Sequence, residues 1–230
     1  MVKRQKTSIA LLALISTPML LLFTNCASIS SPVAPVVPIC FQYVFANDLE
    51  KLKQFPNACV NFETENHITT LMMASSKGHK EIVQFLITNG ATLETKNRVG
   101  HTALAFAVLM NKPEIVKLLI TNGAQISSDS NGISVVMMAI QFDRPEVLKI
   151  LNPNLQDVNL KANDGWTAIY FSIRSQDMAI LDYLFDKGAC PNVIDTYSQS
   201  PLDFANEGNW TASFSHIRKA KLCDALTANP

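Results

Sequence analysis

The chain has 230 residues, of which 48% are hydrophobic and 17% charged, and its 19 basic and 19 acidic residues give a formal net charge of zero. This balance disfavours nucleic-acid binding, which depends on a basic surface. The basic cluster from Lys3 to Lys6 does not supply one, because it belongs to an amino-terminal segment that we expect to be removed.

That first segment combines positive charge with an apolar run. The basic cluster precedes an uncharged apolar stretch from Ile9 to Phe23, which is typical of a secretory signal peptide. The alternative is a transmembrane helix, but the run is short for a stable span and Pro18 interrupts it. We therefore predict that residues 1–25 are a signal peptide.

Cys26 follows directly, after Leu21-Leu22-Phe23-Thr24-Asn25. Its placement resembles the lipobox of bacterial lipoproteins, in which the cysteine becomes the lipidated first residue. Phe23 and Asn25 depart from the lipobox pattern, so ordinary cleavage after Ala27 or Ser30 stays open as the alternative.

Residues 26–38 are rich in Ser and Pro, and Pro32, Pro35 and Pro38 are regularly spaced. This composition favours an extended, semi-rigid tether. The lipoprotein resemblance implies a soluble domain in the envelope of a Gram-negative bacterium, in the periplasm or at the periplasmic face of the outer membrane. Membrane contact is then expected only through the lipid anchor.

The rest of the chain repeats a short phrase about every 33 residues, a period that indicates a solenoid. A small residue follows each copy, and in most copies a second apolar run follows as well. The copies are Thr69-Thr70-Leu71, Thr102-Ala103-Leu104, Ser134-Val135-Val136, Thr167-Ala168-Ile169 and Ser200-Pro201-Leu202.

These copies resemble the ankyrin repeat. Residues 78–86 read Gly-His-Lys-Glu-Ile-Val-Gln-Phe-Leu, and residues 88–91 read Thr-Asn-Gly-Ala, which match the family's second helix and its glycine stop. The resemblance covers residues 40 to 226 and implies an all-α ankyrin-repeat solenoid of helix-turn-helix units with short hairpin loops. Residues 39–230 are then one domain of about six repeats, including degenerate caps at Ile39–Cys59 and Phe214–Leu226.

Local chemistry agrees with these units. The Thr or Ser of each phrase is expected to cap the first helix, and Gly90, Gly123 and Gly188 suit the left-handed residue that ends the second helix. Asn131-Gly132 and Asp164-Gly165 indicate tight turns between units. The family histidine is replaced in every copy, so we expect its hydrogen-bond network between repeats to be missing. The replacements are Met72, Ala105, Met137, Tyr170 and Asp203.

Export changes the interpretation of the cysteines, because disulfides persist in the periplasm. Cys40 and Cys59 fall in the same degenerate first repeat, and Cys190 and Cys223 both lie near the carboxyl end. Disulfides are one interpretation and small buried apolar residues the other, and the connectivity is not readable from sequence. No metal-ligand spacing is present.

Catalytic fingerprints are missing too. The sequence has no nucleophile elbow, phosphate loop, dinucleotide fingerprint or H-E-x-x-H motif. We therefore expect a non-enzymatic chain without a cofactor.

Protein binding remains, and the family resemblance places it on hairpin tips and on first-helix residues of the concave face. The residues before each phrase are Ile68, His101, Ile133, Trp166 and Gln199, and the free pairs at the ends of the first helices are Ser76-Lys77, Leu109-Met110, Gln141-Phe142 and Arg174-Ser175. Apolar patches and aromatic anchors mark partner sites, although Met110 and Phe142 are alternatively core residues. We predict partner binding by Ile68, His101, Leu109, Met110, Ile133, Phe142, Trp166 and Tyr197.

We therefore predict a monomeric module that binds or inhibits another protein in the envelope, such as an immunity or accessory protein of a secreted enzyme. Trp166→Ala is expected to weaken the binding without unfolding the domain. The alternative is a structural envelope lipoprotein that scaffolds membrane components without one tight partner.

Overall fold

Helices make up the regular structure of the chain in the computed structural model, which describes residues 39–219. The expected signal peptide, the tether, Cys26 and Cys223 lie outside the described residues. Within the described part, the extended pairing is limited to two isolated bridges, Glu63 with Thr69 and Ser128 with Ser134. The expected all-α class is therefore confirmed. Between residues 39 and 219, no helix combines the length and hydrophobicity that crossing a membrane requires.

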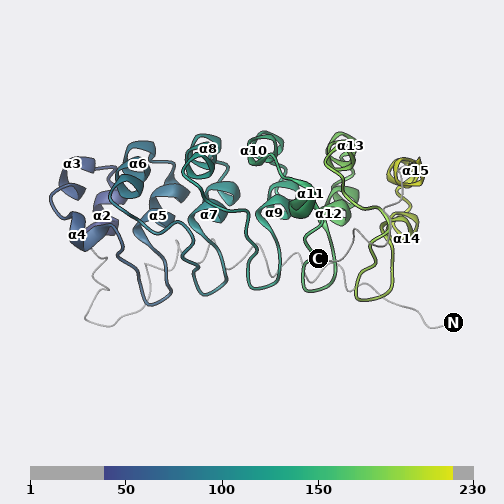
Figure 1. The fold of residues 1–230 in the computed structure, drawn as a ribbon, viewed down its shortest axis with the longest axis horizontal. Helices are drawn as coiled ribbons and strands as arrows, with labels where there is room; N and C mark the ends of the chain where they lie inside the picture. The colour runs from purple at the N-terminus through teal and green to yellow at the C-terminus, as the bar shows by residue number, and fades with distance from the viewer. Residues whose placement is uncertain (1–38, 220–230) are drawn as a thin grey trace, which may run out of the picture. The chain divides into compact units, whose positions relative to one another are not determined.

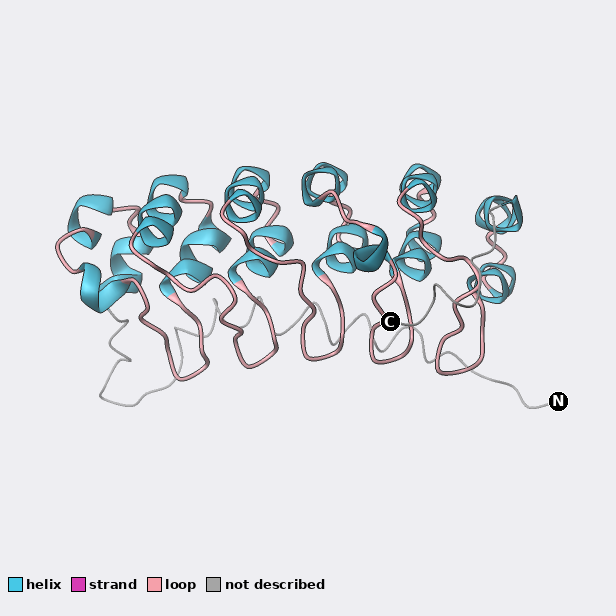
Figure 2. Cartoon of the chain, in the orientation of Figure 1, coloured by secondary structure: helices cyan, strands magenta, loops and turns pink. Residues whose placement is uncertain are grey.

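The helices stand in consecutive pairs, and neighbouring pairs pack side by side in one elongated row (Figures 1 and 2). Inner helices α5, α7, α9, α12 and α14 are each followed by an outer helix, and the loops that join the pairs project together from one side. The bounds are α2 (Ile39–Phe45), α3 (Leu49–Leu52), α4 (Pro56–Cys59), α5 (Thr70–Lys77), α6 (Lys80–Thr88), α7 (Ala103–Leu109), α8 (Pro113–Thr121), α9 (Val135–Gln141), α10 (Pro145–Leu151), α11 (Leu155–Val158), α12 (Ala168–Ser175), α13 (Met178–Asp186), α14 (Pro201–Glu207) and α15 (Thr211–Lys219).

The repeated Thr or Ser begins each inner helix, as expected. Thr69 Oγ1 accepts a hydrogen bond from Met72 N–H at 3.1 Å, and the corresponding bonds to Thr102, Ser134 and Ser200 are present in their helices. Such a bond satisfies one of the backbone donors that a helix start leaves free. Thr167 is the exception, because its Oγ1 is buried and has no hydrogen-bond partner among the described residues.

A left-handed residue follows the outer helices, also as expected. Gly90, Gly123 and Gly188 have φ of 85°, 92° and 86°. Where the sequence lacks this glycine, Asn152 takes the left-handed conformation with φ of 43°. Asn154 then caps the short additional helix α11, so this repeat departs from its neighbours by one extra helical turn.

The core runs along the row between the inner and outer helices. The small residue that follows each phrase is fully buried in all five copies, namely Ala74, Ala107, Ala139, Ser172 and Ala205. Side chains of this size allow neighbouring inner helices to pack closely, as the contacts of α5 with α7 and of α9 with α12 indicate. The outer helices contribute fully buried apolar side chains such as Ile82, Val116 and Leu181. Each repeat therefore buries its apolar surface against its neighbours.

The expectation that hydrogen bonds between repeats are missing is wrong at Tyr170. This residue replaces the family histidine and is fully buried. Its hydroxyl group lies 2.9 Å from the carbonyl oxygen of Val193 and 2.5 Å from that of Gln199, and both of these residues belong to the connection to the next helix pair. Burial is the largest cause that raises the pKa of Tyr170, so the phenol stays protonated and able to donate.

The amino-terminal cap is less regular than a helix pair. Ile39–Cys59 folds into the three short helices α2, α3 and α4, and a disulfide joins Cys40 to Cys59 across them, with the two Cα atoms 5.3 Å apart. Both sulfurs belong to buried residues. Cys190 is disulfide-bonded as well. At the other end, α15 begins at Thr211, three residues before the predicted closing helix.

Removing the first disulfide is expected to destabilise this cap. The bond closes a loop with a sequence separation of 19, and a cross-link of this size stabilises a fold by about 3 kcal/mol, mainly by restricting the unfolded chain. A Cys40→Ala/Cys59→Ala variant should therefore unfold at a lower urea concentration than the parent chain, as measured by circular dichroism. The double variant is preferable to a reductant, because a reductant also cleaves the Cys190 bond. Equal midpoints would show that the cap does not depend on the cross-link.

Candidate partner-binding surface

The loops between helix pairs are five hairpins with the same backbone hydrogen bonds. In the hairpin at Asp129, the Gly132 N–H donates to the Asp129 carbonyl at 3.1 Å, and the Asp129 N–H donates to the Ile133 carbonyl at 3.0 Å. The same two bonds recur in the hairpins that begin at Thr64, Asn97, Ala162 and Asp195. We call the five segments 64–67, 97–100, 129–132, 162–165 and 195–198 the hairpin row.

Side chains at the hairpin starts hold three of these turns in place. Asp129 Oδ1 accepts the N–H groups of Asn131 and Ile133, both at 2.8 Å. Asn97 does the same for Val99 and His101, and Asp195 does it for Tyr197 and Gln199. Asp and Asn mimic a backbone turn in this way, so the shape of these hairpins is fixed before a partner arrives.

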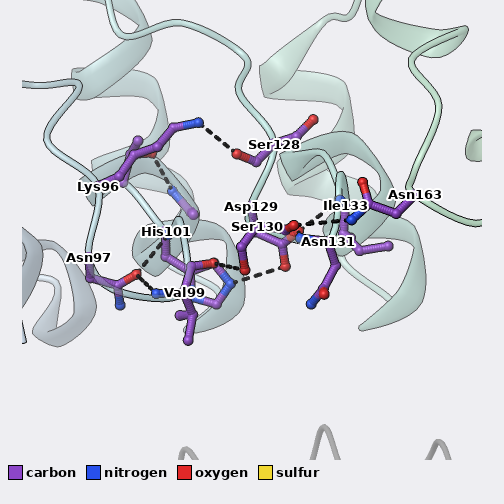
Figure 3. A network of polar contacts seen from close by, with 12 residues as sticks. Lys96, Asn97, Val99, His101, Ser128, Asp129, Ser130, Asn131, Ile133 and Asn163 are labelled. Carbon is purple, nitrogen blue, oxygen red and sulfur yellow. Dashed lines mark hydrogen bonds and ion pairs between the residues drawn. The ribbon is translucent and has the colours of Figure 1, made fainter.

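Neighbouring hairpins are also joined at their tips. The Ser130 N–H donates to the Val99 carbonyl at 3.1 Å, and the Asn163 N–H donates to the Asn131 carbonyl at 2.9 Å. The Ser130 hydroxyl group and the Asn163 side-chain amide add bonds to the carbonyls of Val99 and Ser130 (Figure 3). The remaining two junctions have the equivalent backbone bonds, from Arg98 to Asn66 and from Thr196 to Asp164. The hairpin row is therefore one continuous hydrogen-bonded edge, and a partner that meets it contacts a preorganised surface.

A side-chain contact adds to the junction between the second and third hairpins. His101 Nε2 lies 3.7 Å from Asp129 Oδ2, and both side chains are mostly buried (Figure 3). Burial by itself raises the pKa of Asp129, but the His101 imidazole and the N–H groups of Ile133 and Asn131 together outweigh it. The pKa therefore lies below its ordinary value of 3.8.

This shift predicts a pH-dependent stability. Because the folded state lowers the pKa of Asp129, the carboxylate stabilises the fold fully above its unfolded pKa and loses that contribution as the pH falls through the lower, folded pKa. Asp129→Asn should therefore be less stable than the parent chain at pH 7, and the difference between the two should shrink as the pH falls below about 4. Urea unfolding at pH 7 and at pH 3 measures both. A difference that is the same at the two pH values would contradict the role of the charge.

The predicted partner-binding residues occupy two kinds of position, at the hairpins and at the ends of inner helices. Ile68, His101, Ile133 and Trp166 lie half-buried at the bases of hairpins, and Leu109, Met110 and Phe142 lie half-buried at the ends of α7 and α9. Met110 and Phe142 are therefore partly accessible and not fully enclosed in the core. Tyr197 is at a hairpin tip with 78% of its surface exposed.

Trp166 has a second role that the sequence did not indicate. Its ring centroid lies 5.5 Å from that of Tyr170, 5.7 Å from that of Phe171 and 5.0 Å from that of Phe204. Its Nε1–H donates to Asp195 at 3.3 Å. Trp166 thus packs two helix pairs together, and we no longer expect Trp166→Ala to leave the domain intact.

Two accessible side chains were not among the predicted residues. Val99 stands at a hairpin tip with 49% of its surface exposed, and an apolar residue at a turn position is the signal that identifies it. Arg174 stands at the end of α12 beside Trp166. The sequence places Arg174 in one of the free pairs at the ends of the first helices, but gives no information about what its guanidinium group contacts.

Comparison with known proteins shows which family and which relatives have similar sequences. The family model of ankyrin repeats (three copies) matches residues 41–130 and 136–214. The L-asparaginase of Dirofilaria immitis is 26% identical over 190 residues, which are 81% of this chain and 32% of that protein. The ankyrin repeat protein FPV022 of fowlpox virus is 34% identical over 126 residues, which are 54% of this chain and 21% of that protein. The chain thus spans a third or less of the length of these two relatives.

A similar solved structure covers most of both chains. It belongs to the complex of the predatory endopeptidase Bd0816 from Bdellovibrio bacteriovorus with the immunity protein Bd3460. The matched chain of that complex is 30% identical with a TM-score of 0.69, and the match covers 79% of this chain and 97% of that chain. Because the family model spans most of the sequence and the described helix pairs follow its period, this chain belongs to the ankyrin-repeat family.

Proposed function

We propose that this chain is a non-enzymatic binding protein of the immunity type, which attaches to a peptidase and inhibits it. The observation that carries the proposal is the similarity, over nearly the whole matched chain, to a component of a complex between an endopeptidase and an immunity protein. An ankyrin fold alone does not specify a partner, so the partner class rests on that similarity.

The hairpin row and the adjoining inner-helix face are the surface that we assign to the contact. Fixed loops lose little conformational freedom on binding, and this improves affinity. The row also presents an exposed aromatic side chain, Tyr197, of the type that dominates protein interfaces. A fixed edge of this kind is suited to covering the entrance of a substrate cleft.

The test begins with the chain immobilised through its carboxyl terminus and incubated with the envelope fraction of the organism that encodes it. The retained proteins are identified by mass spectrometry and assayed for peptidase activity with and without added chain. A peptidase that is retained in equimolar amount and loses activity supports the proposal. Retention of no protein, or of a peptidase whose activity is unchanged, contradicts it.

Tyr197→Ala shows whether the hairpin row makes the contact. Because most of the Tyr197 side chain is exposed, the variant should fold normally and bind the recovered peptidase more weakly, by about tenfold or more. Leu155→Ala is the matched control, since Leu155 is 55% exposed but lies in α11, outside the hairpins. Equal weakening by both variants would remove the hairpin row from the interface.

The proposed location is the periplasm or the periplasmic face of the outer membrane, with Cys26 as a lipid anchor. The support is the sequence pattern of residues 1–38, which lie outside the described part of the chain. The intact mass of the protein purified from envelopes tests it. A chain that begins at Cys26 and carries the mass of a diacylglycerol supports the anchor, whereas a chain that begins beyond Cys26 contradicts it.

A further inference from the structure

Arg174, near the end of α12, lies over two aromatic rings. Its Cζ lies 5.5 Å from the centroid of the Trp166 ring and 5.2 Å from the centroid of the Phe171 ring. The residue is half-buried. Contact with two aromatic faces restricts the rotamers of a long side chain and removes part of its water, and both effects strengthen the interaction of the guanidinium group with an anion.

No hydrogen bond or ion pair joins this guanidinium group to another residue between 39 and 219. The group is nevertheless accessible. Arg144 Nε is buried without a partner, but no nitrogen of Arg174 is enclosed in that way. Arg174 therefore presents several N–H donors to solvent from a fixed position.

Three acidic residues of the same two repeats accept hydrogen bonds from donors other than Arg174. Asp164 Oδ1 accepts the backbone N–H of Trp166 at 3.0 Å, and Asp195 Oδ2 accepts the indole N–H of the same residue. Glu207, which holds the equivalent position in the next helix pair, accepts from Gln199 Nε2 at 2.7 Å. Burial lowers the pKa of Arg174, while Asp164 acts in the opposite direction. Arginine remains charged at neutral pH in such an environment.

We propose that Arg174, positioned by Trp166 and Phe171, is an anchor for a carboxylate group of the partner protein. This inference rests on the proposed function, because it specifies the chemistry of one contact on the same surface. The planar guanidinium fork matches the two oxygens of a carboxylate, which it binds through parallel hydrogen bonds. The carboxylate belongs either to an Asp or Glu side chain or to a chain terminus.

The first test needs no partner. The five arginines of the chain give few Nε–Hε signals in a nitrogen–proton NMR spectrum of the full chain, and Arg→Lys variants assign them. The probes are acetyl-Ala-Glu-Ala-amide, its Gln counterpart, and acetyl-Ala-Ala-Ala with a free carboxyl terminus. We expect a saturable shift of the Arg174 signal with the Glu peptide and none with the Gln peptide. An Arg174 shift no larger than that of the exposed Arg98 would overturn the proposal.

The comparison of the two acidic probes identifies the source of the carboxylate. Tighter binding of the Glu peptide assigns Arg174 to an acidic side chain, and tighter binding of the free-terminus peptide assigns it to a chain end. In both cases the shared chemistry is the carboxylate, so either result supports the proposal.

The second test uses the recovered peptidase. Arg174→Gln removes the charge, and Arg174→Lys keeps the charge but removes the fork, so both should weaken binding, by on the order of thirtyfold for Gln. Lys149→Gln is the control, because Lys149 is an exposed cation on the outer helix α10. Unchanged affinity of Arg174→Gln for a peptidase that the parent chain binds overturns the inference and leaves the proposed function standing. A peptide-induced shift of the Arg174 signal without any retained peptidase contradicts the proposed function but leaves Arg174 as a carboxylate-binding group.

Discussion

Replacing Trp166 by alanine is expected to lower the free energy of unfolding by about 3–5 kcal/mol, the usual range for removing a large packed aromatic side chain. The indole ring contacts Tyr170 and Phe171 of its own helix pair and Phe204 of the next. It also donates a hydrogen bond to Asp195. The substitution therefore removes ring contacts and leaves one acceptor without its donor.

The loss should be concentrated at the carboxyl end of the solenoid. Repeats of this kind are stabilised by contacts with their immediate neighbours, and Trp166 lies at the junction of the helix pairs α12–α13 and α14–α15. Urea unfolding followed by amide hydrogen exchange should show early opening of α14 and α15, while α5 to α8 keep their protection. Uniform loss of protection along the chain would contradict a local role.

Tyr197→Ala provides the matched control for this experiment. Tyr197 is an aromatic residue of the neighbouring hairpin, but most of its side chain is exposed, so its replacement should change stability by less than about 0.5 kcal/mol. The pair separates folding from binding. A weakened partner contact in Tyr197→Ala reports on the interface, whereas the same result in Trp166→Ala is explained by the loosened repeats.

The repeat period predicted the parts of the fold that depend on local backbone chemistry. Four of the five repeated Thr or Ser residues cap a helix through their side chains, and Gly90, Gly123 and Gly188 are left-handed. These features follow from the needs of a helix end and are the same in every copy. They are therefore readable from one sequence.

The parts that depend on contacts between repeats were not readable in this way. Tyr170 restores a hydrogen bond between helix pairs because its hydroxyl group extends as far as the Val193 carbonyl, a residue 23 positions along the chain. Asp164, Asp195 and Glu207 accept hydrogen bonds from groups other than Arg174, although Asp164 still acts on the pKa of Arg174. The repeat spacing gives the position of each of these residues within its repeat, but it does not determine which of several neighbouring groups will pair.

The hairpin row yields the second large effect, at Gly100. This residue has φ of +84°, and a Cβ atom added to it would lie 2.5 Å from Ser130 N and 2.8 Å from Asp129 C, both in the backbone of the next hairpin. Replacing Gly100 by alanine therefore lowers the free energy of unfolding for two reasons. The left-handed conformation costs about 1–2 kcal/mol, and the overlap with a neighbouring backbone adds about 1–3 kcal/mol.

Gly123→Ala is the control that carries only the first cost, so the difference between the two variants measures the second. Gly123 has φ of +92°, but no atom outside its immediate neighbours lies within 4 Å of the added Cβ, so only the conformational cost of about 1–2 kcal/mol applies. We expect Gly100→Ala to unfold at the lower urea concentration of the two. Its Ser130 N–H, which bonds to the Val99 carbonyl at 3.1 Å, should also exchange faster with solvent than in Gly123→Ala. Equal stability losses and equal exchange would mean that the hairpins move independently. A larger loss at Gly100 together with faster exchange of Ser130 would instead mean that the hairpins are packed as one edge, in which a change in one hairpin disturbs the next.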